Sequence, residues 1–445
     1  MNTGTIRATA GPVTFAGLEA TTNSGLIDMR DGVPNDTLTL PGSYQGTGGA
    51  TLGVDVASPT ASDRLVIGGA ATGTTAVLVS GIDGSLINGA VVVDAGAGTS
   101  AGAFTYGGGS VGLVDYTLAY LPGSNDFALY GTPSTTAVSM SLIAEGARQI
   151  FYRGNDAVAS HLGSGMGWTG EQPRTARAFW FQGFGMVQDR DATIVAAPFG
   201  QARSYNLDTK QDWFGGQLGF DLAGSGNSVF GLTAGYIGSD MKLKAAPVRF
   251  EYQAANVGAY GRVAAGGFTL SGLIKYEEYW IDVKDRAVGL SASPKGHGWG
   301  GFLEAGYRLG GDRLFVEPLA SIEYANLNID GFDALATGFD IDEADGLRGK
   351  AGLRFGAVLS DSPSRIAAYG KVQAIHEFKG KDRLTLSNSG LALSFTNPRP
   401  DTYGRATVGV DIAMNSGVRG FIEASADFAN GVSGGGARGG LSISF

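Results

Sequence analysis

The residues of this chain that could carry out chemistry are few. Its 445 residues include no Cys and only 3 His, which excludes a disulfide scaffold, a thiolate zinc site and a Cys nucleophile. The stretch Gly108-Gly109-Ser110-Val111-Gly112 matches the G-x-S-x-G motif of serine hydrolases, whose serine lies on a sharp turn between a strand and a helix. The next residues, 113–120, have a strand pattern instead, and residues 1–133 contain no His. We therefore predict that the chain is not an enzyme.

The acidic segment Asp340-Ile341-Asp342-Glu343-Ala344-Asp345-Gly346 is a candidate for Ca²⁺ binding. A loop of this type needs an oxygen ligand at its fifth position and a Glu at its twelfth, whereas this segment has Ala at the fifth and no Glu at the twelfth. We expect a solvated loop. The three His residues, His161, His297 and His376, lack the spacing of metal ligands. We predict neither a metal nor a cofactor.

A third set of candidates consists of charged side chains that alternate with apolar ones. In residues 346–358, Arg348, Lys350 and Arg354 fall on one face of a strand, and apolar side chains fall on the other. Three like charges on one face cannot face a dry core. An apolar face toward lipid and a charged face toward a polar interior satisfy both requirements. The same alternation assigns nine side chains to the interior lining: Arg262, Glu304, Glu317, Glu323, Arg348, Lys350, Arg354, Glu423 and Asp427.

The alternation recurs in twelve segments, and these are the elements that must position the charged residues. They lie near residues 177–189, 207–222, 228–240, 250–264, 268–284, 296–310, 313–328, 346–359, 365–379, 402–414, 418–429 and 436–445. Tight turns and long connections alternate between them, the longest connection being 380–401. This arrangement predicts an all-β fold, a twelve-stranded antiparallel transmembrane β-barrel with turns at one rim and loops at the other.

Two features complicate the barrel prediction. In the segment 268–284, the neighbours Glu277 and Glu278 interrupt the alternation, which implies a bulge or a strand that leaves the membrane. A soluble β-sandwich is the alternative fold, although nothing in a sandwich requires both alternations.

Residues 137–162 have apolar side chains at helical spacing. The possible cap residues Ser134 and Thr135 precede them. A helix of about 26 residues is roughly 39 Å long, which exceeds a bilayer core of about 30 Å. It is too polar to face lipid, and Gly146 and Gly154 keep it thin. We expect a pore-spanning α-helix whose charged side chains pair with the lining: Glu145, Arg148, Arg153 and Asp156.

Residues 1–133 differ in composition from the rest of the chain. They contain ten acidic and three basic side chains and no Lys. Short runs rich in Thr, Val and Leu are separated by Gly, Asp and Asn: 37–40, 64–67, 76–80 and 90–93. These runs predict the stacked coils of a β-solenoid fragment, and a Gly-rich disordered linker is the alternative. Because the sequence pI is near 4.9, we expect no binding to nucleic acid.

The end of the sequence is its most specific part. The last strand, Gly440-Leu441-Ser442-Ile443-Ser444-Phe445, has apolar residues at alternate positions before a terminal aromatic residue. It resembles the C-terminal signal of bacterial outer-membrane barrels, in which Leu441, Ile443 and Phe445 would be recognised by the barrel-assembly machinery. Together with residues 178–185 and the preceding helix, it makes residues 100–445 resemble an autotransporter of type V secretion.

The resemblance implies three parts. Residues 1–133 would be the C-terminal, autochaperone-like part of a β-solenoid passenger, residues 134–166 a linker helix in the lumen, and residues 167–445 the outer-membrane barrel. The barrel would mediate secretion and surface display of its own passenger, as a monomer in outer-membrane lipid, aided by the assembly machinery and periplasmic chaperones. Because residues 1–20 lack a signal-peptide pattern, we expect the chain to be a fragment. The alternatives are a free-standing outer-membrane porin or an adhesin with an N-terminal β domain.

The pair Asn155-Asp156 lies in the predicted helix. Some autotransporters release their passenger by Asn cyclisation inside the barrel, where acidic lumen side chains assist, and Glu304, Glu317 and Glu323 are inward-facing acids here. The second Asn of the family's usual pair is absent. Passenger cleavage at Asn155 is one hypothesis; the other is a helix that is polar because the pore wall is polar.

Overall fold

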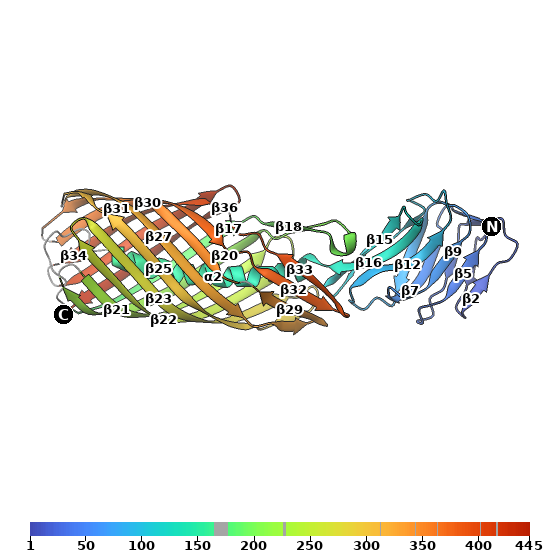
Figure 1. The fold of residues 1–445 in the computed structure, drawn as a ribbon, viewed down its shortest axis with the longest axis horizontal. Helices are drawn as coiled ribbons and strands as arrows, with labels where there is room; N and C mark the ends of the chain where they lie inside the picture. The colour runs from blue at the N-terminus through green and yellow to red at the C-terminus, as the bar shows by residue number, and fades with distance from the viewer. Residues whose placement is uncertain are drawn as a thin grey trace.

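Three parts follow one another along the long axis of the computed structural model (Figure 1). The structure describes residues 1–163, 177–225, 228–311, 313–342, 344–362, 364–400, 402–414 and 417–445. A stack of short strands leads into a helical segment, which enters a barrel whose far rim carries the C-terminus. The predicted helix end at 166 and parts of the predicted turns at 223–227, 311–312, 360–364 and 415–417 lie outside the described residues.

The N-terminal residues form a β-solenoid, so the alternative of a disordered linker is wrong. Successive coils pair in parallel, and Leu38, Leu65 and Val93 stack in register with no exposed surface. Each coil buries its apolar side chains only because the next coil covers them. The strands are β1 Thr5–Arg7, β2 Pro12–Thr14, β3 Ala20–Asn23, β4 Leu26–Asp28, β5 Thr37–Leu40, β6 Ser43–Gly46, β7 Thr51–Ser58, β8 Ala61–Ser62, β9 Arg64–Ile67, β10 Ala71–Gly73, β11 Thr75–Ser80, β12 Ile87–Ala95, β13 Phe104–Thr105, β14 Gly109–Val111, β15 Val114–Leu121 and β16 Asp126–Pro133.

Twelve long antiparallel strands close into a barrel, as the sequence predicts. The first strand pairs along its whole length with the last, from Ala178 opposite Ser444 to Arg190 opposite Val432. The strands are β17 Ala178–Arg190, β20 Thr209–Ser225, β21 Ser228–Leu243, β22 Val248–Ala265, β23 Phe268–Asp285, β25 Lys295–Tyr307, β27 Leu314–Ile329, β30 Gly346–Ser360, β31 Ser364–Lys379, β34 Tyr403–Met414, β35 Val418–Ala429 and β36 Val432–Ser444. Two short strands extend this sheet, β24 Leu290–Ala292 and β26 Leu309–Gly310.

The two faces of the barrel wall differ in polarity. In β30, Leu353 and Phe355 are 50% and 47% exposed on the outside, whereas Arg348 and Lys350 are 0% and 7% exposed on the inside. The predicted bulge at Glu277 and Glu278 is wrong, because β22 and β23 pair without a register shift. The two carboxylates simply lie on opposite faces, Glu277 buried and Glu278 exposed. Within the described residues, no helix has both the length and the apolar character needed to cross a bilayer.

The rim that faces the solenoid carries strands in its long connections, where the sequence predicts loops. Strands β28 Phe332–Ala334, β29 Thr337–Asp342, β32 Arg383–Asn388 and β33 Leu391–Thr396 form one sheet, and β18 Thr193–Ala196 pairs with β19 Arg203–Asn206. We call these six strands the cap. A short 3-10 helix, η2 Pro198–Gly200, lies in the connection between β18 and β19. The expected solvated loop at 340–346 is therefore partly strand, since Asp340 and Asp342 belong to β29.

Candidate functional site

A helical segment occupies the lumen of the barrel and defines the candidate site. It comprises α1 Thr135–Ser139, the 3-10 turn η1 Met140–Leu142 and α2 Ile143–Gly163. Ser134 caps its start, since its hydroxyl accepts a hydrogen bond from the Ala137 N–H. Two glycines let it lie against the wall: a Cβ at Gly146 would be 2.3 Å from the Tyr252 hydroxyl, and one at Gly154 would be 2.6 Å from Lys275 Nζ.

Asp156 is the centre of the ion-pair network between helix and wall. Lys350 Nζ lies 2.5 Å and Arg405 Nη1 2.8 Å from its two carboxylate oxygens. Arg348 and Arg153 contribute longer ion pairs of 3.7 Å each. Because the surroundings are nearly dry, these pairs are stronger than exposed ones, and the loss of either partner would leave a buried charge uncompensated.

Further contacts extend this network along the helix. The Arg153 guanidinium lies 4.7 Å from the Trp213 ring centre and 3.7 Å from Asp427. Lys275 donates to the Phe151 carbonyl at 2.8 Å and pairs with Glu277. These contacts hold the middle of the helix against opposite sides of the wall.

The lower end of the helix is also held by polar contacts. Arg262 donates to the carbonyl of Leu162. The ring of His161 stacks on Trp180 with a centroid distance of 4.2 Å, and its Nε2 lies 3.2 Å from Asp221. These contacts fix the last turns of the helix near the far rim.

The upper end of the helix is tied to the loop that carries β32 and β33. Arg148 makes a two-pronged pair with Asp382, at 2.6 and 3.0 Å, and both side chains are fully buried. Glu145 pairs with Arg190 at the end of β17 and accepts a hydrogen bond from Asn397 at 2.5 Å. The helix therefore fastens the cap to the mouth of the barrel.

The nine predicted lining residues all point inward, but they do two different things. Arg262, Arg348, Lys350, Glu423 and Asp427 contact the helix, Glu423 by accepting a hydrogen bond from Ser160 at 3.3 Å. Glu304 and Glu317 pair with Arg354 from strand to strand, at 3.4 and 3.1 Å, and Glu323 pairs with Arg348 and Lys350.

Several functional contacts are missing from the sequence prediction. Arg405 and Arg438 lie on predicted strands and could have been found by the same alternation, since they face Asp427 and Glu423 across neighbouring strands. Asp382 and Asn397 lie in the longest connection, where no periodicity marks them. Only the three-dimensional path of that loop brings them to the helix.

Asn155, the candidate for cleavage, is fully buried in α2. Neither atom of its side-chain amide has a hydrogen-bond partner among the residues that the structure describes. Its neighbour Asp156 is occupied by cations, and the predicted acids Glu304, Glu317 and Glu323 are paired with Arg and Lys side chains. No contact shown by the described residues brings these acids to Asn155.

The other candidate motifs are placed in ordinary strands. Ser110 lies in β14 and donates to Asp115 at 2.7 Å, and an antiparallel strand rather than a helix follows it. Asp345 accepts hydrogen bonds from Asn326 at 2.6 Å and from Tyr324 at 3.2 Å. His297 and His376 lie in β25 and β31, and the described residues contain no cluster of His, Asp and Glu that could hold a metal.

The C-terminal residues Leu441, Ile443 and Phe445 face outward, with exposures of 61%, 51% and 71%. They lie on the last strand, which closes the barrel against β17. An apolar ridge at this place is suited to lipid contact.

Comparison with solved structures shows the same architecture elsewhere. The chain resembles the transport unit of the autotransporter AIDA-I from Escherichia coli, with a TM-score of 0.51, 14% identity and coverage of 66% of this chain and 99% of that one. It also resembles the translocator domain of the autotransporter NalP from Neisseria meningitidis, with a TM-score of 0.52, 17% identity and coverage of 70% and 100%. At these identities the likeness concerns the fold alone.

The sequence comparisons add a relative and a family. The uncharacterized protein YuaQ of Escherichia coli K12 is 38% identical over 110 residues, a match that spans 23% of this chain and only 8% of that protein. The model of the autotransporter beta-domain matches residues 179–425, more than half of the chain. This protein therefore belongs to the autotransporter β-domain family and is located in the outer membrane.

Proposed function

We propose that this chain is the translocator of an autotransporter, which secretes and displays its own N-terminal domain, residues 1–133. The observation that carries the proposal is the path of the chain. From the solenoid it passes under the cap, and the helix then runs down the lumen until Leu162 meets Arg262. Short turns form the far rim, which in outer-membrane barrels faces the periplasm. The solenoid then stands outside the cell.

The lumen supports this proposal because it is fitted to one helix. Large side chains of the wall approach the helix only at its glycines, and Asp156 neutralises cations from several strands. A polar wall suits the passage of a hydrated chain and its later closure by a helix. The proposed function is thus transport and display rather than catalysis.

Protease treatment of intact cells tests the proposal. Proteinase K added outside should remove the solenoid and leave a protected fragment that contains the helix and the barrel. A solenoid that is digested only after the outer membrane is permeabilised would contradict display. That result would instead support the second candidate, a free-standing porin with a periplasmic β domain, although the filled lumen does not favour it.

We also propose that the chain remains in one piece. Asn155 has no acidic partner within the described structure, as the cyclisation hypothesis would require of the lumen acids. Mass spectrometry of the protein from outer membranes should then give a single chain. Two fragments that divide after Asn155 would restore the cleavage hypothesis.

The remaining partners are part of the same proposal. The outward ridge of Leu441, Ile443 and Phe445 is the surface that we expect the barrel-assembly machinery to recognise, after periplasmic chaperones deliver the chain. The barrel closes on itself through β17 and β36, which supports a monomer because no long strand edge is left open for a second copy.

A further inference from the structure

The cap and the last coil of the solenoid share a polar contact that resembles strand pairing. Asn388, at the end of β32, is 4% exposed. Its side-chain oxygen accepts a hydrogen bond from the Leu86 N–H at 2.8 Å, and its amide donates to the Gly84 carbonyl at 3.2 Å. One side chain of the barrel loop thus satisfies both backbone groups of the solenoid that a neighbouring strand would satisfy.

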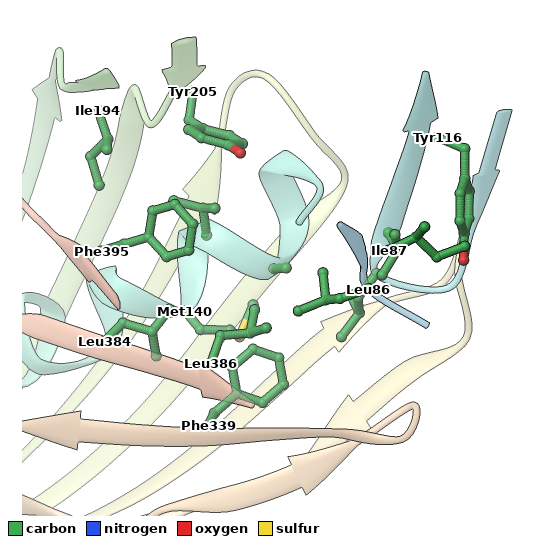
Figure 2. Close-up of a cluster of buried hydrophobic side chains, with 14 of the residues drawn as sticks. Leu86, Ile87, Tyr116, Met140, Ile194, Tyr205, Phe339, Leu384, Leu386 and Phe395 are labelled. Atoms are coloured by element: carbon green, nitrogen blue, oxygen red, sulfur yellow. The ribbon is translucent and has the colours of Figure 1, made fainter. Parts of the chain in front are cut away.

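An apolar cluster surrounds this contact (Figure 2). Leu86 of the solenoid points toward Leu386 of the cap and Met140 of the helical segment, and all three are buried. Phe339, from the neighbouring strand β29, closes the cluster from below. The solenoid, the helical segment and the cap therefore belong to one continuous hydrophobic core.

The second hairpin of the cap holds the other side of the last coil. Arg203 of β19 donates to the Thr132 hydroxyl at 2.9 Å and to the Thr117 hydroxyl at 3.4 Å. These two threonines lie on β16 and β15, the hairpin that ends the solenoid. The cap thus contacts the last coil at two places far apart in its own sequence.

The position of Asn388 is fixed without the solenoid. The next two residues, Ser389 and Gly390, have positive φ angles of 52° and 75° and form the tight turn between β32 and β33. The Asn388 amide also donates to the Thr337 hydroxyl at 3.0 Å, within the cap. Below, the pair between Asp382 and Arg148 anchors the hairpin to the helix. The cap is therefore a preformed surface.

We propose that the cap is a folding template for the last coil of the N-terminal domain. A solenoid coil cannot bury its apolar side chains without a neighbour, so the first coil to fold carries the highest cost. Asn388 and its apolar surroundings supply that first neighbour. The coil formed by β12, β15 and β16 docks on the cap, and the coils toward the N-terminus then stack on it. The proposal rests on the proposed function, because it concerns a chain that emerges at the cap.

Refolding of the full chain in detergent micelles tests the template. Urea is raised until the solenoid unfolds while the barrel stays closed, which is checked by its heat-modifiable migration on gels. Dilution then starts refolding, followed by the return of proteinase K resistance in residues 1–133. Asn388→Ala is compared with Thr385→Ala, which lies on the same strand but is exposed and bonds only to Ser394.

The template predicts that Asn388→Ala slows refolding about tenfold and changes unfolding less than twofold, because the contact is already made in the transition state. Thr385→Ala should behave as the parent chain. If Asn388→Ala accelerates unfolding while refolding is unchanged, or if neither rate changes, the template is wrong. Asn388→Asp keeps the acceptor for Leu86 and should give an intermediate rate, which serves as the test if the Ala variant does not assemble.

The outcome is independent of the surface-display experiment. Slow refolding of Asn388→Ala together with a solenoid that stays in the periplasm would remove the proposed function and leave the template. Normal refolding together with a solenoid exposed on cells would do the opposite.

Discussion

Individual charged residues decide how the helix is held in the lumen. Asp156 faces Lys350 and Arg405 directly, and each of the three side chains would be costly to leave alone in these surroundings. Strand alternation predicts the inward direction of Lys350, because a charge at every second position has only one place to go. It does not predict Asp382, which comes to the helix from a loop with no repeat.

Asp156→Asn should loosen the helix. The change leaves Lys350 and Arg405 without their shared partner, at a cost of about 3–5 kcal/mol for a broken buried pair. The temperature of heat-modifiable unfolding should fall, and channel openings should appear in planar bilayers. The control is Asp361→Asn, whose pairs with Arg313 and Arg365 are partly exposed and worth at most about 1 kcal/mol. Equal behaviour of the two variants would contradict the role given to Asp156.

Tyr116 makes the last coil sensitive to alkaline pH. Its hydroxyl donates to the Ser85 carbonyl at 2.9 Å, and burial raises its pKa to about 12. Since the pKa in the folded state exceeds the unfolded value of about 10, the unfolded chain loses the proton first. The contribution to stability is complete below pH 10 and is lost as the pH rises toward 12.

The pH effect is measured as the urea midpoint of solenoid unfolding, followed by proteinase K digestion. Between pH 10 and 12 the midpoint should fall more steeply in the parent chain than in Tyr116→Phe. The comparison isolates Tyr116, because the pKa values of Tyr44 and Tyr106, raised by burial, remain in both chains. Parallel pH profiles would show that Tyr116 is not the group responsible.

At the scale of elements, the long barrel strands and the helix are predictable and the cap is not. A strand of about 13 residues repeats its alternation several times, so the pattern survives local exceptions such as Glu277 and Glu278. The cap strands have three to six residues. In β32 only Leu384 and Leu386 alternate before Asn388, which is too short a pattern to distinguish a strand from a loop.

Removal of the helix should open the barrel. A chain that begins at residue 164 should conduct in planar bilayers, whereas a matched chain that begins at residue 134, which keeps the helix, should stay closed. Loss of Asp156 leaves Lys350, Arg405 and Arg348 facing an empty lumen, so we expect the open pore to prefer anions. If both chains conduct equally, the helix does not close the pore.

At the scale of the whole molecule, the sequence already divides charge between the parts. Of the formal charge of −9, residues 1–133 contribute −7, from ten acidic and three basic side chains. The solenoid is therefore acidic, while the rest of the chain is close to neutral and pairs its charges internally. The order of solenoid, helix and barrel is predictable from such contrasts. The contact of the solenoid with the cap is not, because it depends on how two distant loops fold over the mouth.

The orientation of the molecule across the outer membrane is the most direct test of the account. Because the chain has no Cys, single cysteines can be placed at three exposed positions: Thr60 in the solenoid, Ser394 in the cap and Ser362 in a turn of the far rim. A membrane-impermeant maleimide should label the first two in intact cells and the third only after permeabilisation. Labelling of Ser362→Cys in intact cells, or of Thr60→Cys only after permeabilisation, would contradict the account.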